Sequence, residues 1–532
     1  MRGERATGPL RWVTAALRGL LAAAAAMGTA ELVAGALGRA TASPLLAVGA
    51  GFIDLTPAWL KDFAIRRFGE NDKTVLLAGL GAGVAAAAMG VGLLGRKRLI
   101  RGVIGLAAFG LVGAAAALTR PTARPADVLP SVAGALAGMA ALILLERGVR
   151  ATRLAATTGG GETARGEAAP PASPSGTGIG RRRVLLTGAG VAGVAAAGGS
   201  VGRMLLRRGD GSSVRAGVRL PDPASPARPV PVGAQVRVPG TTPFRTTSRD
   251  FYRVDTALVL PQVGPRDWTL RIHGMVARPV ELSFDDLLRQ ALIERDITLT
   301  CVSNQVGGDL AGNARWLGAP LAPLLRRAGI VGGADQVLSR SSDGMTLSTP
   351  LDVILDGRDA LLAIGMNGDP LPIAHGFPAR MVVPGLYGYV SATKWVVDLK
   401  VTRFATDQAY WTRRGYAERA PIKTFSRIDV PRPLARLKSG RVAVAGTAWA
   451  QHRGVDAVEW QVDDGPWREA RLAPVPGPDT WRQWVAEWDA TPGAHTLRVR
   501  ATDGTGATQP ARRAPPSPDG ATGRHSVVVT AT

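Results

Sequence analysis

The sequence predicts a multidomain protein with an all-α transmembrane helical region, then an α+β domain, then a β-sandwich of immunoglobulin type. Residues 1–206 are rich in Ala, Gly, Leu and Val, with long uncharged runs, whereas the composition from about residue 215 onward is that of a soluble protein. Short strand-like and helix-like segments follow without regular alternation, and from Pro431 short alternating runs recur between turn residues. A chain of 532 residues has room for several domains.

Four segments are long and apolar enough to cross a membrane within residues 1–157, since a span needs about 20 such residues. They are Trp12–Leu37, Thr74–Leu94, Leu99–Leu118 and Ala126–Leu145. The stretch Ser43–Leu60 is apolar but contains Asp54 and Pro57, so we interpret it as re-entrant or interfacial. Glu31 lies inside the first span, where we expect a protonated carboxyl packed against a neighbour rather than a functional group.

Residues 158–183 form a Gly-, Pro- and Ser-rich stretch that we interpret as a cytoplasmic linker. It ends at Arg181–Arg183, before the apolar run 184–206. Two interpretations of that run stay open, a fifth span with a positive flank and a twin-arginine-like signal anchor. The positions of the Arg clusters predict a multi-pass protein of the cell membrane, in contact with lipid, with its N-terminus inside and its C-terminal domain extracytoplasmic.

Charge and composition exclude several classes of site. The net charge of +23 comes largely from Arg clusters beside apolar segments, and no basic stripe interleaved with aromatics appears, so we expect no nucleic-acid partner. The single cysteine excludes a disulfide framework, a cysteine-based zinc site and a self-contained iron–sulfur cluster. None of the five histidines precedes residue 273, so we expect no haem between the spans.

Residues 207–245 read as a second linker, and 246–430 as a domain of short strands and helices, with Ser283 as a helix N-cap. No GxGxxG motif follows a strand and no Walker sequence occurs. Within this domain Cys301 ends the β-like run ITLTC and opens a glycine-bearing loop. A lone cysteine in a buried strand is usually an inert small hydrophobe, so its surroundings must decide its role.

Three segments supply those surroundings: NARWLGAPLAPLL directly after the loop, then AIGMNGDPLPIAHGFPARMVVPGLYGYVSATKWV, then YWTRRGY. In length, spacing and identities they resemble the sulfite oxidase family of molybdopterin enzymes, and the resemblance covers roughly residues 240–525. It implies an α+β molybdopterin domain of sulfite-oxidase type that carries molybdenum on a single pterin. Cys301 then matches the thiolate that binds the metal, a soft ligand that coordination deprotonates.

The resemblance assigns further residues. Those expected to contact the cofactor are Phe251, Arg253, Asp255, Asn304, Asp343, His375, Arg380 and Lys394. A guanidinium suits phosphate through paired hydrogen bonds, and a lysine acts as a point charge. Arg253 and Tyr416 match active-site positions and would act with Cys301 in catalysis. Asp255 stands where relatives often have His or Asn, which puts that contact in doubt.

Residues 431–532 resemble the immunoglobulin-like dimerisation domain of the family, which implies a possible homodimer. We therefore expect a membrane-anchored molybdenum oxidoreductase of the sulfite oxidase or dehydrogenase type, acting by oxygen-atom transfer on a small oxyanion. The alternative within the class is a sulfoxide reductase, like the methionine sulfoxide reductase relatives. A non-catalytic membrane receptor and a transporter are the alternatives from other classes. Electrons would pass to or from a separate partner, a cytochrome or a quinone.

Overall fold

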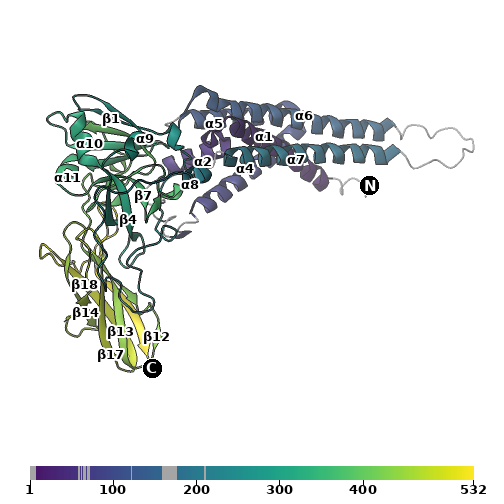
Figure 1. Cartoon of the computed structure of the whole chain (residues 1–532). Helices are drawn as coiled ribbons and strands as arrows, with labels where there is room; N and C mark the ends of the chain where they lie inside the picture. Colours follow the sequence, from purple (N-terminus) through teal and green to yellow (C-terminus); the bar gives the residue numbers. More distant parts are fainter. Residues whose placement is uncertain are drawn as a thin grey trace, which may run out of the picture. The chain divides into compact units, whose positions relative to one another are not determined.

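The computed structural model describes residues 8–57, 60, 63, 67–68, 72–120, 123–158, 176–208 and 211–532. The chain divides into two compact units, one of Met1–Asp210 with Thr256–Val259 and one of Gly211–Asp255 with Leu260–Thr532 (Figure 1). The first unit is helical, and the second contains all the described strands.

The helical unit consists of α1 (Gly8–Ala36), α2 (Pro44–Leu55), α4 (Asp72–Lys97), α5 (Leu99–Leu118), α6 (Leu129–Thr158) and α7 (Gly176–Arg208). All except α2 are long and apolar enough to cross a membrane, which gives five candidate spans among the described residues. α2 has 12 residues. At about 1.5 Å per residue it is too short for a hydrocarbon core of about 30 Å. The helix α7 begins inside the predicted linker 158–183, of which residues 159–175 lie outside the described part of the chain.

Small residues allow the helices to approach closely, as is usual for helices that pack without large side chains between them. α1 packs against α4, α6 and α7. A Cβ added at Gly19 of α1 would lie 2.0 Å from the Ala88 oxygen of α4, and one at Gly202 of α7 would lie 2.3 Å from the Glu31 oxygen of α1. At both crossings, backbone rests on backbone.

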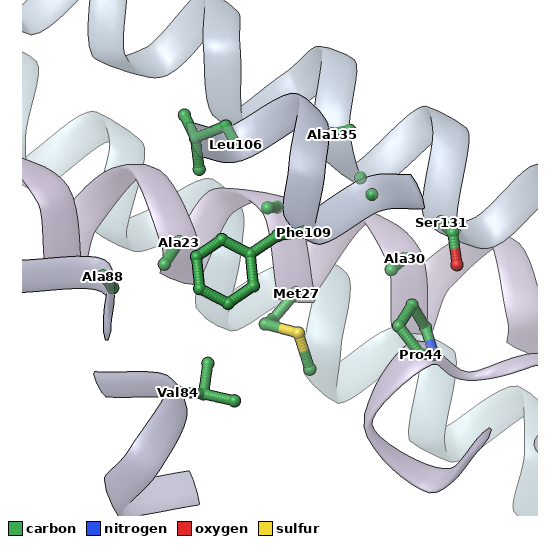
Figure 2. A pocket seen from close by; sticks show the side chains of 13 residues that line it. Ala23, Met27, Ala30, Pro44, Val84, Ala88, Leu106, Phe109, Ser131 and Ala135 are labelled. Atoms are coloured by element: carbon green, nitrogen blue, oxygen red, sulfur yellow. The ribbon is translucent and has the colours of Figure 1, made fainter. Parts of the chain in front are cut away.

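Several polar side chains in this unit are paired with one another. Arg18 of α1 forms a buried ion pair with Glu146 of α6. Glu31 accepts a hydrogen bond from Ser43 Oγ at 2.5 Å, so its carboxyl packs against a neighbour as expected. An apolar cavity of about 70 Å³ lies among α1, α2, α4, α5 and α6, and the hydroxyl of Ser131 borders it without a hydrogen-bond partner among the described residues (Figure 2).

The second unit begins with the short helix α8 (Gly211–Ala216) and an extended segment. This segment, residues 217–255, was expected to be a linker as far as residue 245, but it lies along the domain. Phe244 is buried, and the Ser225 oxygen accepts a bond from Glu294 N at 2.9 Å. Proline-rich extended chain can pair with strand edges in this way without forming a regular strand.

Two sheets and several short helices build the α+β domain. One sheet has the order β2-β1-β10-β5-β6, and the other has the order β3-β4-β7-β8, with β9 on β7. The first contains β1 (Thr269–Gly274), β2 (Val280–Ser283), β5 (Gln336–Ser341), β6 (Thr346–Pro350) and β10 (Val396–Thr402). The second contains β3 (Ile293–Thr300), β4 (Ala311–Pro320), β7 (Leu361–Met366), β8 (Asp369–Pro370) and β9 (Arg380–Val382). The helices are α9 (Phe284–Leu288), capped by Ser283 as predicted, α10 (Leu321–Ala328), α11 (Leu351–Leu355) and α12 (Gly388–Ser391).

Two further sheets share one core at the C-terminal end of the chain, and we call residues 425–532 the C-terminal β-domain. One sheet is β11 (Phe425–Val430), β13 (Gly440–Trp449), β17 (Arg482–Ala490) and β16 (Arg471–Leu472). The other is β12 (Arg436–Leu437), β19 (His525–Ala531), β18 (Gly493–Asp503), β14 (Val455–Val462) and β15 (Arg468–Glu469). Trp460, Trp484 and Trp488 are buried between them. The domain begins before the predicted boundary at Pro431. Its first strand, β11, ends at Val430, so Pro431 follows a strand of this domain.

Candidate active site

The loop after Cys301 is a tight reversal between β3 and β4. Cys301 N donates to the Leu310 oxygen at 2.9 Å, which joins the two ends of the loop. Asn304 lies inside it, where its Oδ1 accepts from Leu310 N at 2.9 Å. Asn304 therefore shapes the loop, whereas the resemblance assigns it a cofactor contact. The Cys301 side chain is buried at the mouth of this reversal.

His375, Arg380 and Lys394 come together around one glycine. A Cβ at Gly376 (φ +110°) would lie 3.0 Å from Arg380 Cβ and 3.2 Å from Lys394 Cβ, so a bare Cα lets the three segments meet. Arg380 NH1 donates to the His375 oxygen at 3.1 Å, and Lys394 Nζ donates to the Ala374 oxygen at 3.3 Å. The run HGFPAR and the run TKW are thus parts of one site.

Asp255 joins Arg253 to this cluster. Its Oδ2 accepts from Arg253 Nε at 2.9 Å and from Lys394 Nζ at 2.6 Å. The Asp255 side chain is 5% exposed and that of Lys394 11%, whereas that of Arg253 is 32% exposed. Of the three, Arg253 is the side chain that a dissolved molecule can reach most readily.

Arg380 is a buried cation held by carbonyl groups. Its guanidinium donates to the oxygens of Met381, His375 and Ala392, and it lies 5.0 Å from the centre of the Trp316 ring. Within the described residues no carboxylate lies in ion-pair distance of it. Burial lowers the pKa of Arg380 to about 10, so it is charged at neutral pH. A buried, charged guanidinium facing only neutral acceptors is suited to an anion that the chain does not itself provide.

Burial and the nearby positive charges also lower the pKa values of Lys394 and His375. Burial lowers the pKa of Lys394 to about 8, although Asp255 opposes the shift. Burial and then the charges of Arg380 and Lys394 lower the pKa of His375 to about 4. His375 is therefore neutral at pH 7, and its Nε2–H donates to the Ser248 oxygen at 2.9 Å.

Two tyrosines that sequence reasoning missed lie near Cys301. Burial raises the pKa of Tyr252, and the negative charge of a Cys301 thiolate raises it further while Arg380 lowers it. Tyr252 thus lies close enough to Cys301 and Arg380 for their charges to act on its pKa. The pKa of Tyr387 is also raised, by burial first and in part by Cys301. Tyr387 stands inside the quoted run that ends in TKWV, and Tyr252 lies between the predicted residues Phe251 and Arg253, which was the available signal.

The other predicted residues occupy more varied positions. Phe251 is a core residue, stacked on Tyr252 at 5.1 Å and edge-on to His375 at 5.6 Å. Asp343 lies in the β5–β6 turn, where its Oδ1 accepts from Met345 N at 3.1 Å. Tyr416 is buried with Trp411 and Tyr389 in an aromatic cluster. Their roles at a bound group remain predictions.

The residues present fit a phosphate-bearing pterin. Arg253 and Lys394 share the carboxylate of Asp255, and Arg380 bonds only to carbonyl oxygens among the described residues, which leaves an excess of positive charge for an anionic group. The turn that carries Asp343 touches the same region, because Ser342 N donates to the Trp395 oxygen at 2.9 Å. The Ser342 hydroxyl is buried there with no hydrogen-bond partner among the described residues, and is available to a polar ligand.

Comparison with known proteins agrees with this chemistry. Residues 257–411 match the family model described as the oxidoreductase molybdopterin binding domain. The uncharacterized oxidoreductase YuiH of Bacillus subtilis is 34% identical over 149 residues, which are 28% of this chain and 72% of YuiH. The mitochondrial sulfite oxidase of Drosophila melanogaster is 30% identical over 296 residues, 46% of this chain and 50% of that protein.

The chain spans about half the length of the curated sulfite oxidases that it matches. Among solved structures, the sulfane dehydrogenase SoxCD from Paracoccus pantotrophus aligns with a TM-score of 0.45 and 25% identity, over 50% of this chain and 75% of that one. The family match includes Cys301 and the cluster of His375, Arg380 and Lys394, which are the residues that the geometry also singles out. This chain belongs to the sulfite oxidase family of molybdopterin-dependent enzymes.

Proposed function

We propose that the chain is a membrane-anchored molybdenum enzyme of the sulfite oxidase or dehydrogenase type, with Cys301 as the protein ligand of the metal. The observation that carries the proposal is the buried guanidinium of Arg380, which bonds only to carbonyl oxygens among the described residues and lies in one cluster with His375 and Lys394. His375, Arg380 and Lys394 would hold the pterin and its phosphate. When bound, this cofactor supplies two-electron redox chemistry with exchange of an oxygen atom.

The residues of the chain have separate tasks in this proposal. Arg253, partly exposed and held by Asp255, would bind the oxygens of a small oxyanion such as sulfite. Burial of Arg380 and Lys394 keeps water from competing for the cofactor phosphate. Tyr416 would complete the pocket by hydrogen bonding to substrate, as its match to the family implies. Oxidation of sulfite with one water then yields sulfate, two protons and two electrons for a separate cytochrome or quinone.

Five apolar helices support the anchoring role of the first unit. We place the C-terminal domains outside the cytoplasm on the distribution of Arg residues, and we assign export to the Arg181–Arg183 segment. The C-terminal β-domain, with two sheets around one core, is proposed as an immunoglobulin-like module for a homodimer.

The first experiment measures molybdenum and pterin in the purified full chain, produced in a host that makes the cofactor. Wild type should contain both at near one equivalent. Cys301→Ala should retain pterin and lose activity, whereas Arg380→Gln should lose pterin. Arg289→Gln is the matched control, because Arg289 is a surface arginine with a 68% exposed side chain. Wild type without molybdenum or pterin would contradict the enzyme proposal and favour a receptor.

The second candidate reaction is sulfoxide reduction, which Asp255 favours because its carboxylate offsets part of the charge that an oxyanion would need. Steady-state rates with sulfite and an electron acceptor, beside rates with methionine sulfoxide and a reduced donor, distinguish the two. Turnover of the sulfoxide alone would overturn the sulfite proposal and leave the molybdenum site standing.

A further inference from the structure

Residues of the C-terminal β-domain enclose the loop 301–310, which we call the Cys301 loop. The loop is folded on itself by Asn304 N, which donates to the Cys301 oxygen at 3.1 Å, and by Gly308 N, which donates to the Gln305 oxygen at 2.9 Å. Its apex, Gly307 and Gly308, contacts strands that lie more than a hundred residues further along the chain. The position of the loop therefore depends on a domain outside the molybdopterin fold.

His525 of β19 covers Gly307. Gly307 has φ +80°, and a Cβ at that residue would lie 2.4 Å from both Cδ2 and Nε2 of the imidazole. The other ring nitrogen, Nδ1, accepts a hydrogen bond from Ile428 N of β11 at 3.0 Å. The ring is thus held by one sheet of the β-domain while its far edge rests on the loop backbone.

His525 is neutral, so its contact with the loop acts through packing and not through charge. Burial and then the nearby guanidinium groups of Arg427 and Arg513 lower its pKa to about 4, while Asp429 opposes the shift. The ring is neutral at pH 7, and because Nδ1 is an acceptor its proton sits on Nε2, beside Gly307. It contributes shape at the loop and no net charge.

Arg427 of β11 holds the next residue of the loop. Its NH1 donates to the Gly308 oxygen at 2.6 Å. The remainder of the guanidinium is engaged by Asp429 Oδ1 at 2.8 Å and by Thr242 Oγ1 at 2.8 Å. Because every side of the planar group has a partner, the bond to Gly308 is fixed in direction.

Gln451 holds the strand that leads into Cys301. Its Nε2 donates to the Thr298 oxygen at 3.0 Å and to Thr300 Oγ1 at 3.1 Å, and the residue is fully buried. On the same edge of β3, Thr298 N donates to the Asp479 oxygen at 2.9 Å. The β-domain thus contacts the sequence on both sides of the cysteine.

We infer that His525, Arg427 and Gln451 are positioning residues for the metal site: the C-terminal β-domain clamps the Cys301 loop and so fixes where the cysteine sulfur points. The consequence for a metal rests on the proposed function, but the clamp is a property of the chain itself. A metal ligand on a glycine-rich loop keeps its direction only if the loop cannot rearrange. By fixing the loop, the clamp would therefore hold the Cys301 thiolate in the direction that the metal requires.

The test uses the single cysteine as its own reporter. The rate at which a maleimide alkylates Cys301 in the cofactor-free full chain measures how often the loop opens. His525→Ala should raise this rate roughly tenfold, as expected for loss of a buried hydrogen bond and its packing. His525→Asn should stay near wild type, because its carbonyl can take the place of Nδ1 and accept from Ile428 N while its amide nitrogen takes the place of Cδ2 beside Gly307.

His495→Ala is the matched control. His495 lies in β18 of the same domain, where it bonds Asp463, and it should leave the rate unchanged. A wild-type rate in a folded His525→Ala chain, or an equal increase in His495→Ala, would overturn the inference. If His525→Ala does not fold, Arg427→Gln carries the same expectation and the same overturning result.

Two further readouts separate positioning from general destabilisation. Gly307→Ala and His525→Ala should be less than additive in alkylation rate, because removing the ring also removes the overlap that the new methyl meets. In the loaded enzyme, His525→Ala should shift the thiolate-to-molybdenum absorption band and His525→Asn should restore it; an unshifted band would overturn positioning of the sulfur. A chain without molybdenum would refute the proposed function and leave the alkylation result intact.

Discussion

Asp255 determines how much positive charge the site presents to a substrate. It is the carboxylate that Arg253 and Lys394 share, and its own side chain is nearly buried. In such surroundings a charge acts strongly on neighbours, because little water screens it. A site with Asn here would keep its shape and gain one unit of positive charge.

Asp255→Asn should therefore lower the KM for sulfite several-fold at low ionic strength, with a smaller effect at high salt, and leave the KM for a neutral sulfoxide unchanged. Steady-state kinetics at two salt concentrations measure this. Asp250→Asn is the control, since Asp250 is exposed and bonds only locally to Thr247. A higher KM for sulfite would show that Asp255 acts mainly by holding Arg253 in place.

His375 makes the stability of the cofactor-free protein depend on pH. Its pKa is about 4 in the folded chain against a usual value of 6.5. At pH 7 the imidazole of His375 is mostly neutral in both the folded and the unfolded chain. As the pH falls from 6.5 towards 4, the imidazole of the unfolded chain binds a proton and that of the folded chain does not. Stability should fall over that range by about 3 kcal/mol from this residue.

His375→Gln should flatten this dependence, because its amide can still donate to the Ser248 oxygen and does not titrate. Unfolding midpoints of both chains between pH 7 and pH 4.5 provide the measurement. His525, whose pKa is also about 4, remains in both chains, so its contribution cancels in the comparison. Parallel curves for the two proteins would contradict the assignment.

Sequence reasoning identified the charged residues of the site but not their full surroundings. HGFPAR and TKW are local motifs, so His375, Arg380 and Lys394 could be singled out without a fold. The coupling of Tyr252 to Cys301 joins residues on different segments, and only the tertiary structure brings them together. Asn304 illustrates the opposite error. The motif suggested a cofactor contact, whereas in the structure its side chain accepts a hydrogen bond from Leu310 N and closes the loop.

At the scale of elements, α7 is tied to α1 by backbone contact. A Cβ at Gly35 would lie 2.5 Å from the Gly202 oxygen, and one at Gly202 would meet the Glu31 oxygen at 2.3 Å. Close approach of this kind gives van der Waals contact over a long stretch of helix and tolerates no side chain at the crossing. α7 is therefore an integral helix of the first unit.

Gly202→Leu should separate α7 from α1 and lower the thermal midpoint of the detergent-solubilised chain by several degrees. Gly190→Leu on the same helix is the matched control, because a Cβ there meets nothing within 4 Å. Scanning the two variants beside wild type measures the difference. Equal midpoints for all three would show that the α1–α7 crossing contributes nothing to stability.

Element boundaries were predictable where hydrophobicity alone defines them. Four of the five long apolar helices match the spans chosen from hydropathy, and the fifth, α7, contains the run 184–206, for which two interpretations were left open. α7 begins at Gly176, before its apolar run. Hydropathy did not predict this start, because Gly176–Arg183 is helical without an apolar pattern. The predicted boundaries left β11 and the extended segment around Phe244 outside the domains to which they belong. Their strand pairing and burial depend on residues that are distant in the sequence, so local patterns do not reveal them.

At the scale of the whole molecule, the Arg181–Arg183 segment precedes every residue that we propose to bind the cofactor. A domain that takes up a bulky cofactor inside the cell must cross the membrane folded, which a twin-arginine signal permits. Arg181→Lys with Arg182→Lys keeps the positive charge and removes the arginine pair. We expect this variant to retain the C-terminal domains inside the cell.

Protease treatment of intact cells would reveal the change, since wild-type C-terminal domains should be digested and those of the variant protected. A variant that contains Lys at position 183 alone serves as the control. Digestion of both proteins would mean that the arginines act only as a positive flank, as the topology rule also allows.

The contact of His525 with Gly307 has a consequence for the order of biogenesis. His525 lies in β19, which follows every strand of the α+β domain, so a ribosome has made that whole domain before the ring that covers the Cys301 loop exists. A nascent chain that already contains every family motif still has an unclamped loop. Completion of the Cys301 loop thus waits for the synthesis of β19, which makes that strand a condition for a finished loop.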